Sequence, residues 1–229
     1  MIKALIVVNP ILGSVRAMET MCREVSHEEN AVQKMNYLFN KGRMMLCVEL
    51  FLLICILWRT PIILGYFGQD PYISGLAGTY LSYSAPALIS FAHINYIRRY
   101  LSVKEVHYPP IIIQLFCTAI HIPMTWYFVN VVDMGMIGAG MAITISNTFC
   151  LFLMYLYAYS QEDLHEFVQF EIVSAFTEWW PYFVRMVQIG IALVIETMYA
   201  QIITLMAGMF HITNQLAAHI ALDNFANIL

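Results

Sequence analysis

The carboxylate of Glu196 lies in a stretch that is otherwise almost entirely apolar, ALVIETMYAQIITLMAG at residues 192–208. Placing a carboxylate at the middle of a bilayer costs about 3 kcal/mol on insertion scales, so such a group is a candidate functional residue. Helical spacing puts three small residues on its face: Ala192, Ala200 and Thr204. Small residues let a neighbouring helix approach closely, so this face is expected to turn inward. We expect Glu196 to bind and release a cation; the alternative is a hydrogen bond that only locks two helices together.

Three other residues are candidates for the same site. Tyr199 lies beside Glu196 and could offer an aromatic face to an organic cation, or could simply pack. Gln201 follows Glu196 by five residues, about 140° around a helix, so the two do not share one face. Asp223 belongs to the apolar stretch 216–229 and could line a cavity.

A fourth candidate, His121, lies deep in another apolar run, with Pro123 two residues after it. A proline inside a helix removes one backbone hydrogen bond, so we expect a kink and a freed carbonyl that can bind a ligand. Kinked helices of this kind let transporters rock. The alternative for His121 is an ordinary packing residue. The nearby Trp126 and Tyr127 could face an organic cation, but aromatic residues in so aromatic a chain more often pack.

Two charged residues near the ends of an apolar run have a simpler interpretation. Glu49 is expected to reach the interface or pair with Lys41 or Arg43, and Arg59 is expected to extend outward to the opposite interface.

The composition of the chain defines its class. Of its 229 residues, 60% are apolar and only 11% are charged, and the apolar residues are spread over the whole length. A soluble domain has about one quarter charged residues, so this composition predicts an all-α, polytopic transmembrane helical bundle. No basic tract indicates nucleic-acid binding, and the five cysteines show no CxxC spacing, so no metal site or cofactor is expected.

Five apolar runs are long enough to cross a bilayer: 44–67, 73–97, 109–132, 136–159 and 181–210. Two shorter pieces, 4–15 and 216–229, are interpreted as spans cut by the chain ends. Short joins at GQDPYIS (68–74) and DMGMIG (133–138) predict antiparallel neighbours, with a helix starting at the proline of the first join.

The basic residues predict an orientation. Eight of the eleven Lys and Arg residues fall in two segments that we interpret as loops, 16–43 and 98–104, whereas the joins at 68–72 and 133–135 have none. By the positive-inside rule the two basic segments lie together on the cytoplasmic side.

Several stretches resemble the multidrug and toxic compound extrusion (MATE) family. They are AMETMC (17–22), GQDPYISGLAGTYLSYSAPAL followed by RRYL (68–101), HIPMTWYFVNVVDMGMIGAGMAITIS (121–146) and LAAHIALDNFANIL (216–229). The resemblance extends over residues 13–229 of this chain, which correspond to the middle part of a family member. Thr125, Ser102 and Gln188 stand where the family usually has other residues, so substrate specificity is not transferable.

The resemblance implies a domain organisation. Residues 1–160 would form most of an amino-terminal six-helix lobe, 161–180 a cytoplasmic inter-lobe linker, and 181–229 the start of a carboxy-terminal lobe. Glu196 matches a Glu that family members use for cation coupling, and Gln201 stands where many eukaryotic members carry a second Glu.

The function that the resemblance implies is not enzymatic. It is an antiporter that exports organic cations or xenobiotics in exchange for H+ or Na+, with the lipid bilayer and a small organic substrate as partners, in the plasma or vacuolar membrane. The oligomeric state, the substrate and the coupling ion stay open. The alternatives are an inactive or partner-dependent truncated transporter and a multi-span membrane enzyme or receptor.

Overall fold

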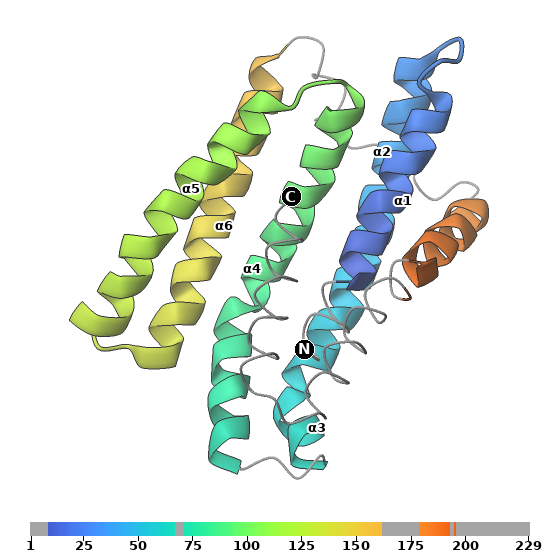
Figure 1. Ribbon diagram of the computed structural model, residues 1–229. Helices are drawn as coiled ribbons and strands as arrows, with labels where there is room; N and C mark the ends of the chain where they lie inside the picture. The colour runs from blue at the N-terminus through green and yellow to red at the C-terminus, as the bar shows by residue number, and fades with distance from the viewer. Residues whose placement is uncertain (1–8, 67–70, 162–178, 193–194, 196–229) are drawn as a thin grey trace, which may run out of the picture.

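The computed structural model describes residues 9–66, 71–161, 179–192 and 195 (Figure 1). Every regular element within these ranges is a helix. In chain order they are α1 (Asn9–Val25), α2 (Ala31–Trp58), α3 (Thr60–Tyr66), α4 (Pro71–Val103), α5 (Tyr108–Trp126), the π-helix η2 (Tyr127–Val131) and α6 (Gly135–Ser160). Residues 179–192 form a further helix. The prediction of an all-α bundle is confirmed.

Helix α4 lies in the middle of the bundle. It packs against α1 and α2 on one side and against α6 on the other, and α5 lies against α6 (Figure 1). The α1–α2 connection and the α4–α5 connection lie at one end of the bundle, whereas α3 ends and α6 begins at the other. The predicted grouping of the basic segments is therefore confirmed, and we call their side the basic end.

The helices at the basic end are longer than the apolar runs predicted. The segment 16–43 is not a loop, because α1 continues to Val25 and α2 already begins at Ala31. Likewise, α4 continues through the basic segment 98–104 as far as Val103. Apolar runs report which residues can lie in hydrocarbon, and a helix is free to continue beyond that layer because Arg, Lys, Gln and Glu are good helix formers.

Two features predicted at the opposite end, the start of α4 and the hairpin before α6, are confirmed. Helix α4 begins at Pro71, as predicted. Proline fits the first position of a helix because the N–H that it lacks would have no intrahelical partner there. At the hairpin before α6, Asp133 has φ 59° and Gly135 has φ 52°, so two residues adopt the left-handed conformation within three positions. The hairpin is tight, as expected.

Small residues on α6 allow close contact with α4. A Cβ atom at Gly140 would lie 2.8 Å from the Cβ of Tyr83, which is closer than real side chains approach. Thr144 on the next turn donates from its hydroxyl to the carbonyl of Tyr83 at 2.7 Å. Small-residue contacts and interhelical hydrogen bonds are the usual means of packing helices where lipid removes the hydrophobic drive between them.

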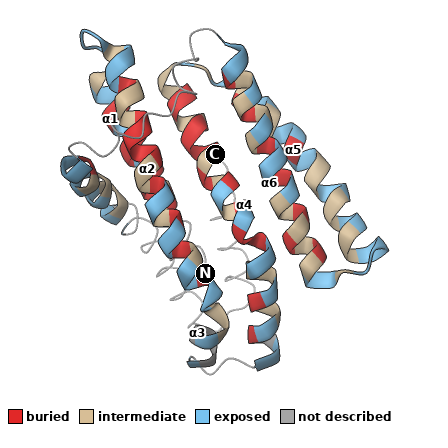
Figure 2. Ribbon diagram, turned by 180° about the vertical axis from the view of Figure 1, so that it is seen from behind, coloured by how far each residue is buried: buried red, intermediate tan, exposed pale blue. Residues whose placement is uncertain are grey.

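The best-buried part of the bundle lies near the basic end, between α1, α2 and α4 (Figure 2). The Phe39 ring of α2 packs against Tyr96 and Tyr100 of α4, with centroids 4.8 and 4.6 Å apart. The Tyr96 hydroxyl donates to the Phe39 carbonyl at 3.0 Å, so this buried phenol has a partner.

Two segments in the described part of the chain are long and apolar enough to cross a membrane, Tyr108–Val131 and Gly135–Ser160. They match the predicted spans 109–132 and 136–159. The run 44–67 is divided between α2 and α3, 73–97 lies within α4, and only the first part of 181–210 is described.

Candidate functional site

One face of α5 carries polar side chains at helical spacing. They are Gln114, Thr118, His121 and Thr125, separated by four, three and four residues. Such spacing places side chains on one face, so α5 has a polar stripe although its other residues are largely apolar. Thr125 donates to the His121 carbonyl at 2.9 Å, which occupies its hydroxyl within the helix.

The polar stripe of α5 faces a matching pair on α6. Ser146 is 6% exposed, and its hydroxyl lies 3.0 Å from Nδ1 of His121. Asn147 follows Ser146 and its amide reaches the Ala87 carbonyl of α4 at 3.5 Å. Three helices are thus joined by polar contacts, and His121 has a definite partner.

These residues line a cavity of about 220 Å³ between α4, α5 and α6. Its polar lining consists of Gln114, Thr118, His121, Ser146 and Asn147. Phe91, Ile94, Ile143, Cys117 and Cys150 supply the apolar lining. A cavity with a few placed polar groups on apolar walls is the usual form of a small-molecule site.

The side chain of Arg98 is hydrogen-bonded to those of Gln114 and Asn95, and the three border the cavity on the side of the basic end. Arg98 of α4 donates to Gln114 Oε1 at 3.1 Å and to Asn95 Oδ1 at 2.9 Å. Because Gln114 also lines the cavity, the Arg98 guanidinium stands between the cavity and the basic end.

Irregular backbone lies beyond His121 on α5. Pro123 lies inside α5, and the helix keeps its α-helical form to Trp126 before it widens into η2. The irregular backbone begins at Tyr127, one turn after the proline, and the kink and freed carbonyl expected at Pro123 stay a prediction. π-helical turns inside helices often mark functional sites, and a helix with a proline and a π-turn close together is a reasonable place for a bend.

Four predicted site residues, Glu196, Tyr199, Gln201 and Asp223, lie outside the described residues. Trp126 and Tyr127 are 61% and 51% exposed and do not line the cavity. Of the predicted candidates, the structure places His121 in the cavity and Pro123 just beyond it.

The two charged residues of α2 also have definite positions. Glu49 accepts a hydrogen bond from Ser14 of α1, so its carboxylate holds two helices together. Arg59 is the C-cap residue of α2 and is exposed, which agrees with a side chain extending outward.

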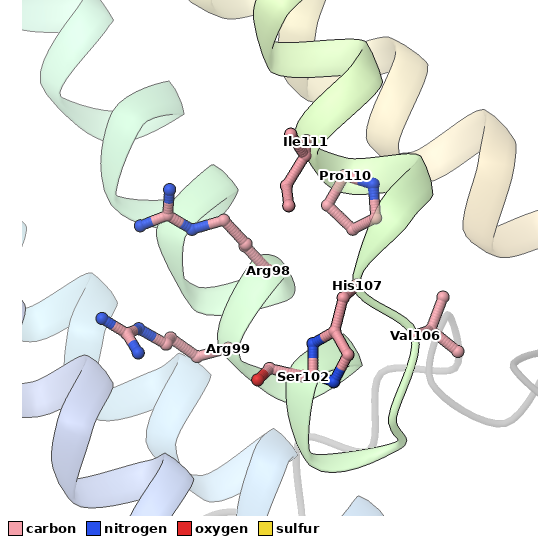
Figure 3. A pocket seen from close by; sticks show the side chains of 7 residues that line it. All are labelled: Arg98, Arg99, Ser102, Val106, His107, Pro110 and Ile111. Atoms are coloured by element: carbon pink, nitrogen blue, oxygen red, sulfur yellow. The ribbon is translucent and has the colours of Figure 1, made fainter. Parts of the chain in front are cut away.

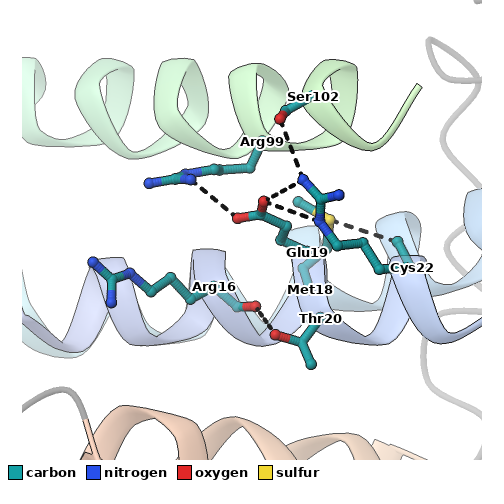
Figure 4. A network of polar contacts seen from close by, with 8 residues as sticks. Arg16, Met18, Glu19, Thr20, Cys22, Arg99 and Ser102 are labelled. Atoms are coloured by element: carbon teal, nitrogen blue, oxygen red, sulfur yellow. Dashed lines mark hydrogen bonds and ion pairs between the residues drawn. The ribbon is translucent and has the colours of Figure 1, made fainter. Parts of the chain in front are cut away.

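Two of the motifs that carried the family resemblance meet in an ion pair. Glu19, from AMETMC, accepts from Arg99, from RRYL, at 3.2 Å, and also pairs with Arg23 at 3.0 Å (Figure 4). Glu19 is only 14% exposed, whereas Arg23 is 55% exposed. The carboxylate therefore joins α1 to α4 at the basic end.

The helix at 179–192 lies close against α1 and α2. A Cβ atom at Gly13 would come within 2.8 Å of the Gly190 Cα atom. Tyr182 is 4% exposed and packs with Ala17 and Met21 of α1. At the basic end, Arg185 pairs with Glu24 of α1.

Sequence reasoning missed Gln114, Ser146 and Asn147. The signal was present, because Gln114, Thr118, His121 and Thr125 repeat at intervals of three and four residues. The Ser146–Asn147 pair is likewise conspicuous within the apolar run of α6.

Comparison with known proteins gives consistent results. The MatE family model matches residues 1–127. Protein DETOXIFICATION 3 of Arabidopsis thaliana is 30% identical over 170 residues, which cover 72% of this chain and 35% of that protein. Protein DETOXIFICATION 7 of Arabidopsis thaliana is 28% identical over 201 residues, which cover 79% of this chain and 39% of that protein.

A solved structure agrees in fold. The crystal structure of the eukaryotic MATE transporter AtDTX14 superposes with a TM-score of 0.79 at 20% identity, over 90% of this chain and 46% of that one. The chain thus spans well under two thirds of the proteins that it matches. Because the family model covers more than half of its residues, the chain belongs to the MatE family.

Proposed function

We propose that this protein is a secondary active transporter, an antiporter that expels organic cations or related compounds in exchange for H+ or Na+. The observation that carries the proposal is the MatE match over residues 1–127. The relatives' names, DETOXIFICATION 3 and DETOXIFICATION 7, agree with removal of toxic compounds. Members of this family are multi-pass membrane proteins and not enzymes.

The cavity between α4, α5 and α6 supports this proposal. Polar groups inside a membrane bundle are expensive, and they commonly mark ion or substrate pathways. His121, Ser146 and Asn147 are such groups, and the π-helix η2 gives α5, the helix of His121, a place to bend. A transporter needs both a polar site and a helix that can change its shape.

The contacts of the helix at 179–192 support a two-lobed arrangement. We assign residues 1–160 to the amino-terminal lobe, 161–180 to the linker and 181–229 to the start of the other lobe. In that assignment the Gly13–Gly190 approach and the Glu24–Arg185 pair are contacts between lobes. Rocking of the lobes would open and close these contacts.

In the proposed mechanism, the coupling ion and the substrate compete for Glu196. The ion neutralises the carboxylate in one orientation of the lobes, and a cationic substrate replaces it in the other. Tyr199, Gln201 and Asp223 are proposed to contact the substrate. His121 is proposed to contribute from the amino-terminal lobe.

The test is gradient-driven efflux by the full-length protein in proteoliposomes, with ethidium as the cationic probe. Glu196→Gln is expected to abolish efflux driven by a proton or sodium gradient, while the protein still folds. Glu28→Gln is the matched control, because Glu28 pairs with Lys34 at an exposed position in the α1–α2 connection. Unchanged gradient-driven efflux in Glu196→Gln would overturn the proposal.

A further inference from the structure

A second cavity, of about 330 Å³, lies at the basic end between α4 and α5. Its walls come from the last turns of α4 and the first turn of α5, mainly Arg98, Arg99, Ser102, His107, Pro110 and Ile111. Figure 3 shows Arg98 and Arg99 extending from α4 in the same direction, with Ser102 and His107 close together one turn further on. The cavity is separate from the one that contains His121.

The two arginines of this cavity differ in their partners. Arg99 has a carboxylate partner, Glu19 at 3.2 Å. Within the described residues, Arg98 donates only to the neutral amide oxygens of Gln114 and Asn95. Glu19 also attracts Arg98, but its carboxylate is already paired with Arg99 and Arg23. Three guanidinium groups therefore share one carboxylate, and the cavity wall keeps a net positive charge.

The backbone around the cavity adds to its positive character. Helix α5 begins at Tyr108 and its first turn lines the cavity, so the positive end of its dipole lies there, although Pro109 and Pro110 have no N–H to donate to a ligand. His107, the N-cap residue, makes no capping hydrogen bond with its side chain, and its ring lines the cavity. Glu105 in the same connection is exposed and does not line the cavity.

The α4–α5 connection is held by regular hydrogen bonds. Glu105 has φ 62°, and its N–H donates to the Ser102 carbonyl at 3.2 Å. The N–H of Val106 donates to the Leu101 carbonyl at 2.9 Å. This pair of bonds is the Schellman motif that ends a helix, so the backbone that carries Ser102 and His107 has a defined conformation without a ligand.

An apolar strip leads away from this cavity along α5. Ile111, Leu115 and Ile122 lie on one face and are 58%, 70% and 67% exposed. A ligand with a phosphate group at Arg98 and acyl chains along this strip would match both surfaces. A free phosphate ion would use only the basic part.

We propose that this cavity binds the phosphate group of an anionic phospholipid on the cytoplasmic side of the membrane. Arg98 supplies the charge, Ser102 and His107 supply hydrogen bonds, and the lipid chains lie on Ile111, Leu115 and Ile122. Basic pockets between membrane helices on the cytoplasmic side are suited to such headgroups. The proposal does not depend on which compound the protein transports.

The experiment measures lipid binding to the purified full-length protein in detergent by native mass spectrometry. The probes are phosphatidic acid, phosphatidylcholine and inorganic phosphate. We expect phosphatidic acid to bind more tightly than phosphatidylcholine, and inorganic phosphate neither to bind detectably nor to displace it. Arg98→Gln is expected to weaken phosphatidic acid binding roughly five-fold, the effect of one basic residue near the surface.

Three further variants separate charge from folding. Arg59→Gln removes one positive charge at the opposite end and is expected to leave binding unchanged. Gln114→Ala removes one of the two amide partners of Arg98 but keeps its charge, so lipid binding is expected to weaken less than in Arg98→Gln. His107→Gln removes the ring that lines the cavity and is expected to weaken lipid binding. The described residues show no hydrogen bond made by the His107 side chain, so the substitution breaks none of them.

Three outcomes would overturn the proposal. Equal binding of phosphatidylcholine would show that headgroup charge is not recognised. Full phosphatidic acid binding in both Arg98→Gln and His107→Gln would place the lipid elsewhere. Displacement of the lipid by inorganic phosphate would assign the cavity to a soluble phosphate compound.

Discussion

The two sides of α4 differ in what they enclose. Toward α1 and α2, the Tyr96 and Tyr100 rings are each 1% exposed and pack on Phe39. Toward α5 and α6, the same helix borders a cavity of about 220 Å³ that contains His121 and Ser146. One helix therefore belongs to a closed aromatic core on one side and to a polar cavity on the other.

The difference teaches how a membrane bundle can be both fixed and adaptable. Helices in lipid gain little from burying apolar surface, so their association depends on close packing and hydrogen bonds. The α1–α2–α4 side uses both, whereas the α4–α5–α6 side leaves space and polar groups that a ligand can use. We expect substitutions on the first side to change stability and those on the second to change function.

The largest expected effect is at Gly42 of α2. A Cβ atom there would overlap the hydroxyl groups of Tyr96 and Tyr182, so Gly42→Ala forces two buried rings to move. Overpacking of this kind costs about 1–3 kcal/mol of the free energy of unfolding. Unfolding of the purified protein in an SDS titration measures this loss.

The control for Gly42→Ala is Gly75→Ala on α4. Among the described residues, no atom outside the adjoining backbone of α4 lies within 4 Å of a Cβ at Gly75, and alanine favours helix over glycine, so stability should stay the same or rise slightly. Equal losses in the two variants would contradict the packing argument.

The next effect concerns the ion pairs of Glu19. The side chain of Arg99 is 36% exposed and that of Arg23 is 55% exposed, and both reach the same carboxylate. Because solvent screens exposed pairs, Arg99→Gln is expected to lower the free energy of unfolding by up to about 1 kcal/mol, and Arg23→Gln by less. Salt screens these ion pairs, so the losses of unfolding free energy in both variants should be smaller when the SDS titration is repeated at high salt. A larger loss in Arg23→Gln than in Arg99→Gln would contradict the expectation that the less exposed pair contributes more to stability.

Much of the fold was predictable from the sequence, because apolar runs and basic segments report directly on the membrane. The starts of α4 and of α6 followed from Pro71 and from the hairpin at 133–138. The lengths of α1 and α2 did not, because charged residues at 16–43 were interpreted as a loop although they favour helix. Hydropathy locates the lipid layer and does not locate the ends of helices.

The site was predictable only in part. His121 and Pro123 stand out as single residues, but the interhelical partner of His121 is Ser146 of α6, 25 residues away, and no local pattern pairs them. The ion pair of Glu19 with Arg99 likewise joins two motifs that the sequence keeps 80 residues apart. Which residues pair between two helices depends on how each helix is rotated about its axis and how deep it lies in the membrane. The sequence specifies both only through the packing of side chains.

The smallest expected effect decides whether the polar cavity serves folding or function. His121 and Ser146 lie 3.0 Å apart, and interhelical hydrogen bonds in membranes contribute about 0.6 kcal/mol on average. A double-mutant cycle with His121→Ala and Ser146→Ala should therefore give a coupling free energy near that value in the SDS titration.

If the hydrogen bond only holds α5 to α6, transport by each variant should fall only as far as its loss of folded protein explains. If the cavity contacts the substrate, both variants should change the KM for ethidium efflux while Gly75→Ala leaves it unchanged. A wild-type KM in both variants would assign the cavity to packing. The two sides of α4 would then differ only in how completely side chains fill the space between the helices.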